Sequence, residues 1–156
     1  MSSGMSWQTE SISAEQTEQL GEVVGRKLRG GETIELVSDL GGGKTTFTRG
    51  LVRGTGSSDR VGSPTFTLSR EYQAPHFVVA HFDFYRLGEA GIVGDELHEL
   101  IGDPAYVTVI EWGEIVHDVL PDRRLTVQFE QAGDEKRSIT ISYPVELAYV
   151  LEDVVR

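Results

Sequence analysis

Apolar residues recur at helical spacing through residues 14–28, and residues 33–37 then follow the pattern of a β-strand. Ser13 and Gln16 form a capping box at the start of this segment, in which each side chain can bond to backbone near the other. The pattern predicts a helix over residues 14–28, which a pair of glycines then ends. Residues 33–37 predict a strand that leads directly into a glycine-rich segment.

The chain after the glycine-rich segment predicts a short helix and two strands. Residues 44–53 carry apolar residues at helical spacing, which favours a helix. A polar linker at 55–62 leads to residues 63–72, where apolar and polar residues alternate as in a half-buried strand. A turn at 73–76 separates this strand from a more apolar one at 77–83, and so tight a turn makes the two antiparallel.

The second half of the chain predicts two helices around a buried strand. Residues 95–101 favour a helix of two or three turns, which a glycine and a proline end. Residues 106–111 form an apolar run that finishes on an acid, as expected of a strand covered on both faces. A short helix is predicted over residues 113–119.

The C-terminal part predicts a hairpin followed by a helix. Residues 125–129 and 138–143 alternate apolar and polar positions and flank a turn-rich segment, so they favour two antiparallel strands. Residues 144–155 begin with proline and carry apolar residues at helical spacing, which predicts an amphipathic closing helix. Strands and helices thus alternate, which indicates an α/β protein.

Length and composition indicate one folded domain. The chain has 156 residues, enough to bury a core without disulfides, and 38% of them are hydrophobic. We expect residues 13–156 to form a single domain and residues 1–12 to be a flexible N-terminus. Residues 1–4 precede a second methionine and are interpreted as a cloning scar or an upstream start.

Charge and cysteine content exclude several classes of function. The formal net charge of -11 disfavours a broad basic surface for nucleic acid, because phosphate contacts require clustered lysine and arginine. The absence of cysteine excludes disulfides, thiolate zinc sites and cysteine nucleophiles. No apolar run approaches the roughly 20 residues of a membrane span, and the N-terminus lacks the apolar core of a signal peptide, so we expect a cytoplasmic protein.

The segment SDLGGGKTT at residues 38–46 is typical of a phosphate-binding loop between a strand and a helix. In such loops backbone N–H groups surround a polyphosphate, the lysine reaches the β and γ phosphates, and the next hydroxyl binds Mg²⁺. These roles fall on Lys44 and Thr45. Ser38 stands where the strict motif has glycine, and a glycine-like φ at this serine would cost about 1 kcal/mol and weaken nucleotide binding.

Two acids, Asp83 and Glu111, each end an apolar strand. If the strand ending at Asp83 runs parallel to the strand before the loop, Asp83 lies on the same edge, where ligands of open α/β sheets bind. Mg²⁺ prefers hydroxyl, carboxylate, water and phosphate oxygens, so Thr45 with one acid can ligate it while the other acid handles the attacking water. Alternatively, each acid only caps a strand. The pattern leaves the division of these roles open.

Four further residues have a functional and a structural interpretation. Thr65 is either a switch-loop threonine that senses Mg²⁺ or the γ phosphate, or a strand residue. Arg86 either stabilises transferring phosphate charge or pairs with a neighbouring acid. For His81 we expect a structural hydrogen bond. For Trp112 we expect a place in the core in preference to packing on the nucleotide loop or on a partner. The histidines show no zinc-ligand spacing.

Four segments occur in one order: DLGGGKTTF at 39–47, SPTFTL at 63–68, HFDFYRL at 81–87 and IEW at 110–112. In this combination the chain resembles the TsaE family, the bacterial ATPases of tRNA threonylcarbamoyladenosine (t6A) biosynthesis. The resemblance runs from about residue 13 to the hairpin near residue 143. It departs at Ser38, where the family usually has glycine.

The resemblance implies a P-loop NTPase-like fold, with a mixed sheet, helices on both faces and a C-terminal β-hairpin plus helix. It also implies ATP and Mg²⁺ as cofactors and the proteins TsaB and TsaD as partners. ATP hydrolysis would reset the TsaB–TsaD complex between catalytic cycles. TsaD would carry out the carbamoyl transfer, so this chain would meet tRNA only indirectly.

The resemblance assigns site residues by motif position. The expected nucleotide-binding residues are Asp39, Leu40, Gly41, Gly42, Gly43, Lys44, Thr45, Thr46 and Thr65. The expected catalytic residues are Lys44, Asp83 and Glu111, and the expected metal ligands are Thr45, Asp83 and Glu111.

Two other functions share a phosphate loop. A small-molecule kinase needs an acceptor pocket and usually an arginine-bearing lid, and no arginines cluster where a lid would fall. A nucleotide-gated binding module with negligible hydrolysis is the second alternative, and Ser38 would be its sign. We expect ATP hydrolysis that depends on partner proteins.

Overall fold

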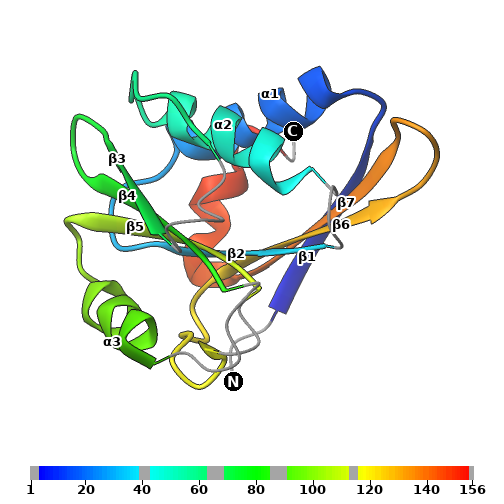
Figure 1. Cartoon of the computed structure of the whole chain (residues 1–156). Coiled ribbons are helices and arrows are strands. Elements are labelled where there is room, and N and C mark those ends of the chain that lie inside the picture. Colours follow the sequence, from blue (N-terminus) through cyan, green and yellow to red (C-terminus); the bar gives the residue numbers. More distant parts are fainter. Residues whose placement is uncertain (1–3, 39–42, 63–68, 85–90, 113–115, 155–156) are drawn as a thin grey trace.

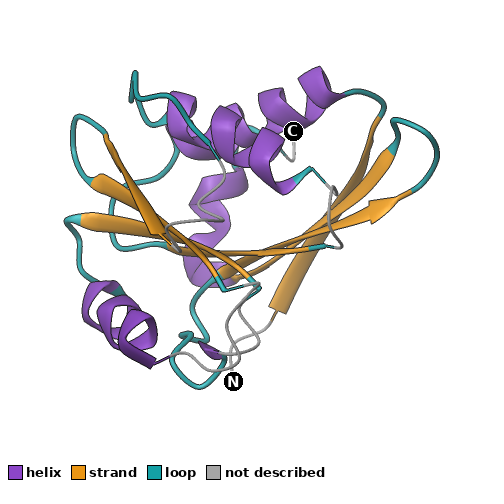
Figure 2. Ribbon diagram, viewed as in Figure 1, coloured by secondary structure: helices purple, strands orange, loops and turns teal. Residues whose placement is uncertain are grey.

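A single β-sheet with helices on both faces makes up the computed structural model (Figures 1 and 2). The structure describes residues 4–38, 43–62, 69–84, 91–112 and 116–154. In chain order its elements are β1 Gly4–Ser11, α1 Ala14–Arg26, β2 Thr33–Val37, α2 Lys44–Gly54, β3 Ser69–Gln73, β4 Val78–Asp83, α3 Gly91–Leu100, β5 Tyr106–Glu111, β6 Leu125–Gln131, β7 Arg137–Pro144 and the 3₁₀ helix η2 Val145–Leu151. Within these described segments, no helix combines the length and the apolar character that crossing a membrane requires.

The strands lie in the order β1-β7-β6-β2-β5-β4-β3. The central strand β2 pairs in parallel with β5 and β6, and β4 pairs in parallel with β5. The hairpins β3–β4 and β6–β7 are antiparallel, and so is the pairing of β1 with β7. The predicted mixed sheet and C-terminal hairpin are therefore confirmed. Because β2, β5 and β4 are parallel, their C-terminal ends meet at one edge of the sheet.

Each face of the sheet carries its own apolar core. α1, α2 and η2 cover one face, and α3 covers the other (Figure 2). Successive residues of a strand point to opposite faces, so β5 sends Val109 to the core under α2 and Ile110 to the core over α3. The helices on both faces agree with the expected fold class.

The first helix begins as its capping box predicts. Gln16 N donates to Ser13 Oγ at 3.2 Å, and Ile12 N donates to Gln16 Oε1 at 3.0 Å. These two bonds satisfy backbone N–H groups that the helix itself leaves unpaired. α1 ends at Arg26, two residues before the predicted end at residue 28.

Helices α1 and α2 pack with their backbones in close contact. The residues that allow this are Gly21 and Gly25 on α1 and Gly50 and Gly54 on α2. A Cβ added at Gly50 would lie 1.9 Å from Glu18 O, a distance that no side chain tolerates. The close fit therefore fixes the position of α2, whose first residue is Lys44.

The expectation of a flexible N-terminus at residues 1–12 is wrong for the part that the structure describes. β1 pairs with β7 along its whole length, from Gly4 opposite Pro144 to Ser11 opposite Arg137. Most of its side chains are exposed, so no apolar alternation marks it in the sequence. Backbone pairing with β7, which would otherwise be an open edge, holds the strand in place.

Several other boundaries differ from the predictions. The amphipathic helix expected over residues 144–155 is the 3₁₀ helix η2, whose buried residues Leu147 and Val150 follow the three-residue period of that helix. α3 begins at Gly91, earlier than the predicted residue 95. Of the strand predicted at residues 63–72, the structure describes the part from Ser69 onward, which belongs to β3. Of residues 113–119, predicted to form a helix, the structure describes only 116–119.

Candidate functional site

Lys44 stands at the first position of α2, one short connection after the central strand β2. The residue before it, Gly43, has a φ of 104°, in the left-handed region that glycine adopts without strain. The helix continues from this point, with Phe47 N donating to Gly43 O at 2.9 Å. The sequence therefore brings a lysine and the N-terminus of a helix to the edge where the parallel strands end, as the phosphate loop predicts.

The Lys44 side chain is buried, and its ammonium group contacts three of the described residues. Its Nζ donates to Ser38 O at 3.4 Å and lies 3.8 Å from Glu111 Oε1. The same Nζ lies 4.3 Å from the centre of the Trp112 ring, within the range of a cation–π contact. A carboxylate, a carbonyl and an aromatic face thus hold the ammonium group.

The two predicted acids lie side by side. Asp83 ends β4, Glu111 ends β5, and the parallel register places them opposite each other. They are 7% and 5% exposed, and they point to the same face of the sheet as α2. The prediction that Asp83 lies on the same edge as the loop is confirmed, because β4, β5 and β2 all run in one direction.

His81 contacts the catalytic candidate Glu111 directly. Its Nε2 lies 2.5 Å from Glu111 Oε2, and the ring is fully buried. The other ring nitrogen, Nδ1, is buried with no hydrogen-bond partner among the described residues. A structural hydrogen bond was expected for His81, but the sequence did not indicate that its partner is Glu111. Strand alternation in the sequence places His81 and Asp83 on the same face of the sheet. The proximity of Glu111 to His81 follows only from the pairing of β4 with β5.

Trp112 directly follows Glu111 and has a backbone φ of 58°. This left-handed conformation costs a residue with a side chain about 1–3 kcal/mol, and such strain concentrates at functional sites. The ring is partly buried against the core on the α3 side and also faces Lys44. Trp112 therefore packs on the core, and its ring also faces Lys44, the lysine of the predicted phosphate loop.

Other predicted residues are described in part or not at all. Thr45 and Thr46 lie in the first turn of α2 and are half-buried. Asp39, Leu40, Gly41, Gly42, Thr65 and Arg86 lie outside the described residues.

Ser38 does not adopt the positive φ that glycine would allow at this position. Trp112 is the non-glycine residue with positive φ within the described segments, and Ser38 is not. The strain expected at Ser38 is therefore absent. Its carbonyl oxygen instead accepts a hydrogen bond from Lys44, which a glycine would accept equally well.

The chemistry of this edge fits ATP with Mg²⁺. A helix N-terminus and a lysine suit phosphate groups, and the Thr45 hydroxyl with the Asp83 and Glu111 carboxylates offers the oxygen ligands that Mg²⁺ prefers. The described residues contain no group of three or more His, Cys, Asp or Glu side chains arranged to hold a metal by themselves. A Mg²⁺ site completed by phosphate oxygens and water needs no such group.

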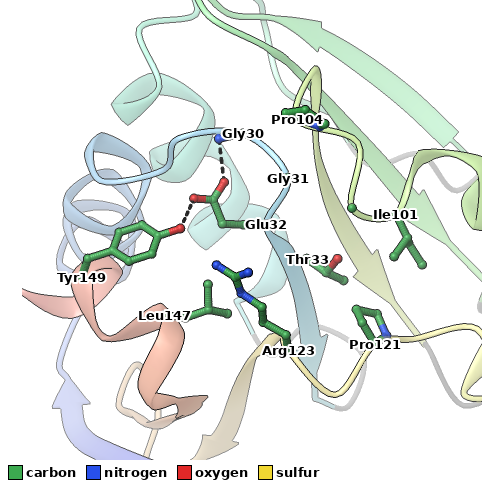
Figure 3. Close-up of a pocket in the computed structure, with 11 residues that line it drawn as sticks. Gly30, Gly31, Glu32, Thr33, Ile101, Pro104, Pro121, Arg123, Leu147 and Tyr149 are labelled. Carbon is green, nitrogen blue, oxygen red and sulfur yellow. Dashed lines mark hydrogen bonds between the residues drawn. The ribbon is translucent and has the colours of Figure 1, made fainter.

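A cavity of about 250 Å³ opens at the edge of the sheet opposite Lys44 and Glu111 (Figure 3). Its wall includes Glu32, a 4% exposed acid that accepts hydrogen bonds from Arg29 N at 2.8 Å, Gly30 N at 2.7 Å and the Tyr149 hydroxyl at 2.5 Å. Burial and the bond to Glu32 raise the pKa of Tyr149 to about 12. Among the described residues, no predicted site residue lines this cavity. Glu32 joins η2 to the start of β2.

Comparisons with known proteins agree on one family. The family model of the threonylcarbamoyl adenosine biosynthesis protein TsaE matches residues 11–139. The chain is 33% identical over 142 residues to the tRNA threonylcarbamoyladenosine biosynthesis protein TsaE of Bacillus subtilis, covering 88% of this chain and 85% of that protein. It is 37% identical over 132 residues to the protein of the same name from Treponema pallidum, covering 85% and 97%.

The fold has a close counterpart among solved structures. A crystal structure of YdiB from Bacillus subtilis superposes with a TM-score of 0.76 at 29% sequence identity and covers 98% of this chain and 95% of that one. The family model and both relatives indicate the same family, and the solved structure shares the fold. In this chain that fold brings Lys44, Asp83 and Glu111 to one edge of the sheet. The chain belongs to the TsaE family of tRNA threonylcarbamoyladenosine biosynthesis proteins.

Proposed function

We propose that this protein binds ATP with Mg²⁺ and hydrolyses it to support t6A modification of tRNA, resetting a complex of TsaB and TsaD between catalytic cycles. The observation that carries the proposal is the meeting of Lys44, at the start of α2, with Glu111 at the end of β5. A buried lysine at a helix N-terminus suits a polyphosphate, and an acid at the same point suits the water that attacks it.

Lys44 would exchange one anion for another when nucleotide binds. In this structure its Nζ lies 3.8 Å from Glu111 Oε1, near the long limit of an ion pair. A triphosphate carries more charge than the carboxylate and would draw the ammonium group away. Glu111 Oε1 would then be free to accept a hydrogen bond from water.

We assign the two acids different roles on their contacts. Glu111 faces Lys44, the residue that would bind the β and γ phosphates, so Glu111 is the acid placed to orient the attacking water. Asp83 lies beside it on β4 and would ligate Mg²⁺ together with the Thr45 hydroxyl. The metal, when bound, would neutralise charge on the phosphate oxygens.

The partners are proposed on the family and on charge. The net charge of -11 does not suit direct binding of tRNA, so the chain would act on the proteins that hold it. We place this activity in the cytoplasm, with ATP hydrolysis dependent on TsaB and TsaD.

The test is phosphate release from ATP, measured with the protein alone and with TsaB and TsaD. Release that rises with both partners supports the proposal. Transfer of phosphate to a small molecule would indicate a kinase. ATP binding without release, even with partners, would indicate a nucleotide-gated binding module. Lys44→Ala should abolish the release, and Lys136→Ala, which changes an exposed lysine of the β6–β7 turn, is the matched control.

A further inference from the structure

We propose that His81 is a positioning residue, which holds the Glu111 carboxylate in the orientation that turns Oε1 toward Lys44. The inference rests on the proposed function and adds to it a residue that acts through Glu111. It is carried by one short contact between two side chains that are both buried.

The two contacts of the Glu111 carboxylate differ in length. Oε2 lies 2.5 Å from His81 Nε2, whereas Oε1 lies 3.8 Å from Lys44 Nζ. The shorter contact constrains the carboxylate more, because hydrogen bonds weaken with distance and require alignment. His81 therefore sets the rotation of the carboxylate. If Lys44 turns to a phosphate, the bond to His81 remains.

The contact also assigns the proton on the ring. A carboxylate paired with a lysine can only accept hydrogen bonds, so His81 Nε2 must donate. The other ring nitrogen, Nδ1, is buried and has no hydrogen-bond partner among the described residues. A histidine kept only for stability would be expected to satisfy both nitrogens, since buried polar groups are nearly always paired. Within the described part of the chain, the one hydrogen bond of this ring goes to Glu111, the acid that we propose orients the attacking water.

The position of His81 in the sheet supports the same role. It lies on β4 opposite Val109 of β5, one strand away from Glu111 and on the same face. Strands hold side chains more rigidly than loops do, so a donor on β4 keeps the last residue of β5 oriented where the chain leaves the sheet. Trp112, directly after Glu111, has a left-handed backbone, a conformation that persists only where the surrounding structure holds it.

The first experiment separates orientation from folding. His81→Leu removes the donor, His81→Gln keeps an amide N–H in the region of Nε2, and Val79→Ala opens the same face of β4 without touching Glu111. With TsaB and TsaD present, His81→Leu should lower kcat about 10–100-fold and leave the KM for ATP close to the wild-type value. His81→Gln should recover most of kcat. Val79→Ala should lower Tm and keep kcat.

The inference is overturned if His81→Leu keeps a wild-type kcat while Tm falls, because His81 then only supports the fold. It is equally overturned if His81→Leu raises KM as much as it lowers kcat, since orientation of the water-handling acid does not alter ATP binding. The inference is also overturned if His81→Gln has the Tm of the wild type but does not recover kcat.

The second experiment needs no nucleotide and no turnover. Long-range ¹H–¹⁵N NMR spectra of the free protein should show the His81 proton on Nε2, and Glu111→Gln should move that proton resonance strongly. Absence of a proton on Nε2, or a resonance that Glu111→Gln leaves in place, overturns the inference. Absence of ATP hydrolysis in the wild type would refute the proposed function, and the NMR result would still decide whether His81 holds Glu111.

Discussion

Lys44 Nζ and Glu111 Oε1 lie 3.8 Å apart, and both side chains are more than nine-tenths buried. Each charge depends on the other, because neither is well solvated and desolvating a lone charge is costly. The pair is nevertheless long, and Glu111 has a second, shorter contact with His81. The lysine is thus the more easily displaced member, which suits a residue that binds phosphate in one state and a carboxylate in another.

Breaking this pair from one side should cost more than removing both charges. Lys44→Met leaves the Glu111 charge buried without its cation, which should lower the free energy of unfolding by up to about 3 kcal/mol. Adding Glu111→Gln to Lys44→Met should restore part of that loss. Urea unfolding of both single variants and the double variant gives the coupling. Purely additive losses would show that the ion pair contributes little, and Lys136→Met at an exposed lysine should change stability little.

Nucleotide binding should change the fluorescence of Trp112. The Lys44 ammonium group lies 4.3 Å from the centre of that ring, and its movement to a phosphate would remove a charge from the indole face. The chain has two tryptophans, so the titration belongs in a Trp7→Phe background. Lys44→Met in the same background should show a shifted emission without ATP and no response to it. An unchanged spectrum on saturation would mean that Lys44 stays over the ring.

Glu111→Ala should separate ATP binding from hydrolysis. Loss of an acid that orients or activates water should slow turnover about 100-fold or more, while the lysine and the helix N-terminus still bind phosphates. Calorimetry gives the affinity, and phosphate release with TsaB and TsaD gives the rate. Glu135→Ala, at an exposed acid of the β6–β7 turn, is the control. Retained turnover in the Glu111 variant would remove this residue from the catalytic role.

The helices and strands that carry the site can be predicted from short stretches of sequence, because apolar runs, capping residues and the phosphate-loop motif each act over a few neighbouring residues. The run of residues 106–111 is apolar on both faces and ends at an acid, and β5 has those same bounds. Ser13 and Gln16 mark the start of α1 for the same reason, since a capping box acts within four residues. The phosphate loop likewise predicts that a lysine begins the next helix, as Lys44 does.

Features that depend on register between distant segments could not be predicted. The contact of His81 with Glu111 joins residues 30 positions apart and needs the parallel alignment of β4 with β5. Strand β1 forms its backbone pairing with β7, and most of its own side chains are exposed, so its sequence lacks the apolar alternation of a strand. In both cases the deciding interaction lies outside the window in which hydrophobic periodicity acts.

The close packing of α1 on α2 should not tolerate a single added methyl group. Gly50→Ala would place a Cβ 1.9 Å from Glu18 O, so the helices must separate. The expected loss is about 1–3 kcal/mol from overpacking, which exceeds the gain of about 1 kcal/mol that alanine brings to a helix. Thermal unfolding measures it. Gly133→Ala is the control, because a Cβ there meets only ordinary contacts beyond 3.4 Å. An equal Tm for both variants would show that the helices can part freely.

The bond between Tyr149 and Glu32 should give the protein an alkaline dependence of stability (Figure 3). Burial and the bond to Glu32 raise the pKa of Tyr149 to about 12, above the ordinary value of 10.0. The folded state therefore holds this proton more tightly than the unfolded state does. The resulting stabilisation is complete below pH 10 and is lost as the pH rises toward 12.

Tyr149→Phe isolates this contribution from those of the other tyrosines. The variant loses one hydrogen bond to a carboxylate that keeps two backbone donors, so at neutral pH it should be less stable by about 1 kcal/mol. Urea unfolding at successive pH values should show the wild type and the variant converging between about pH 10 and pH 12. Parallel curves over that range would show that the Tyr149 proton is held equally in the folded and unfolded chains. Coincident curves would show that the hydroxyl bond to Glu32 does not stabilise the junction of η2 with β2.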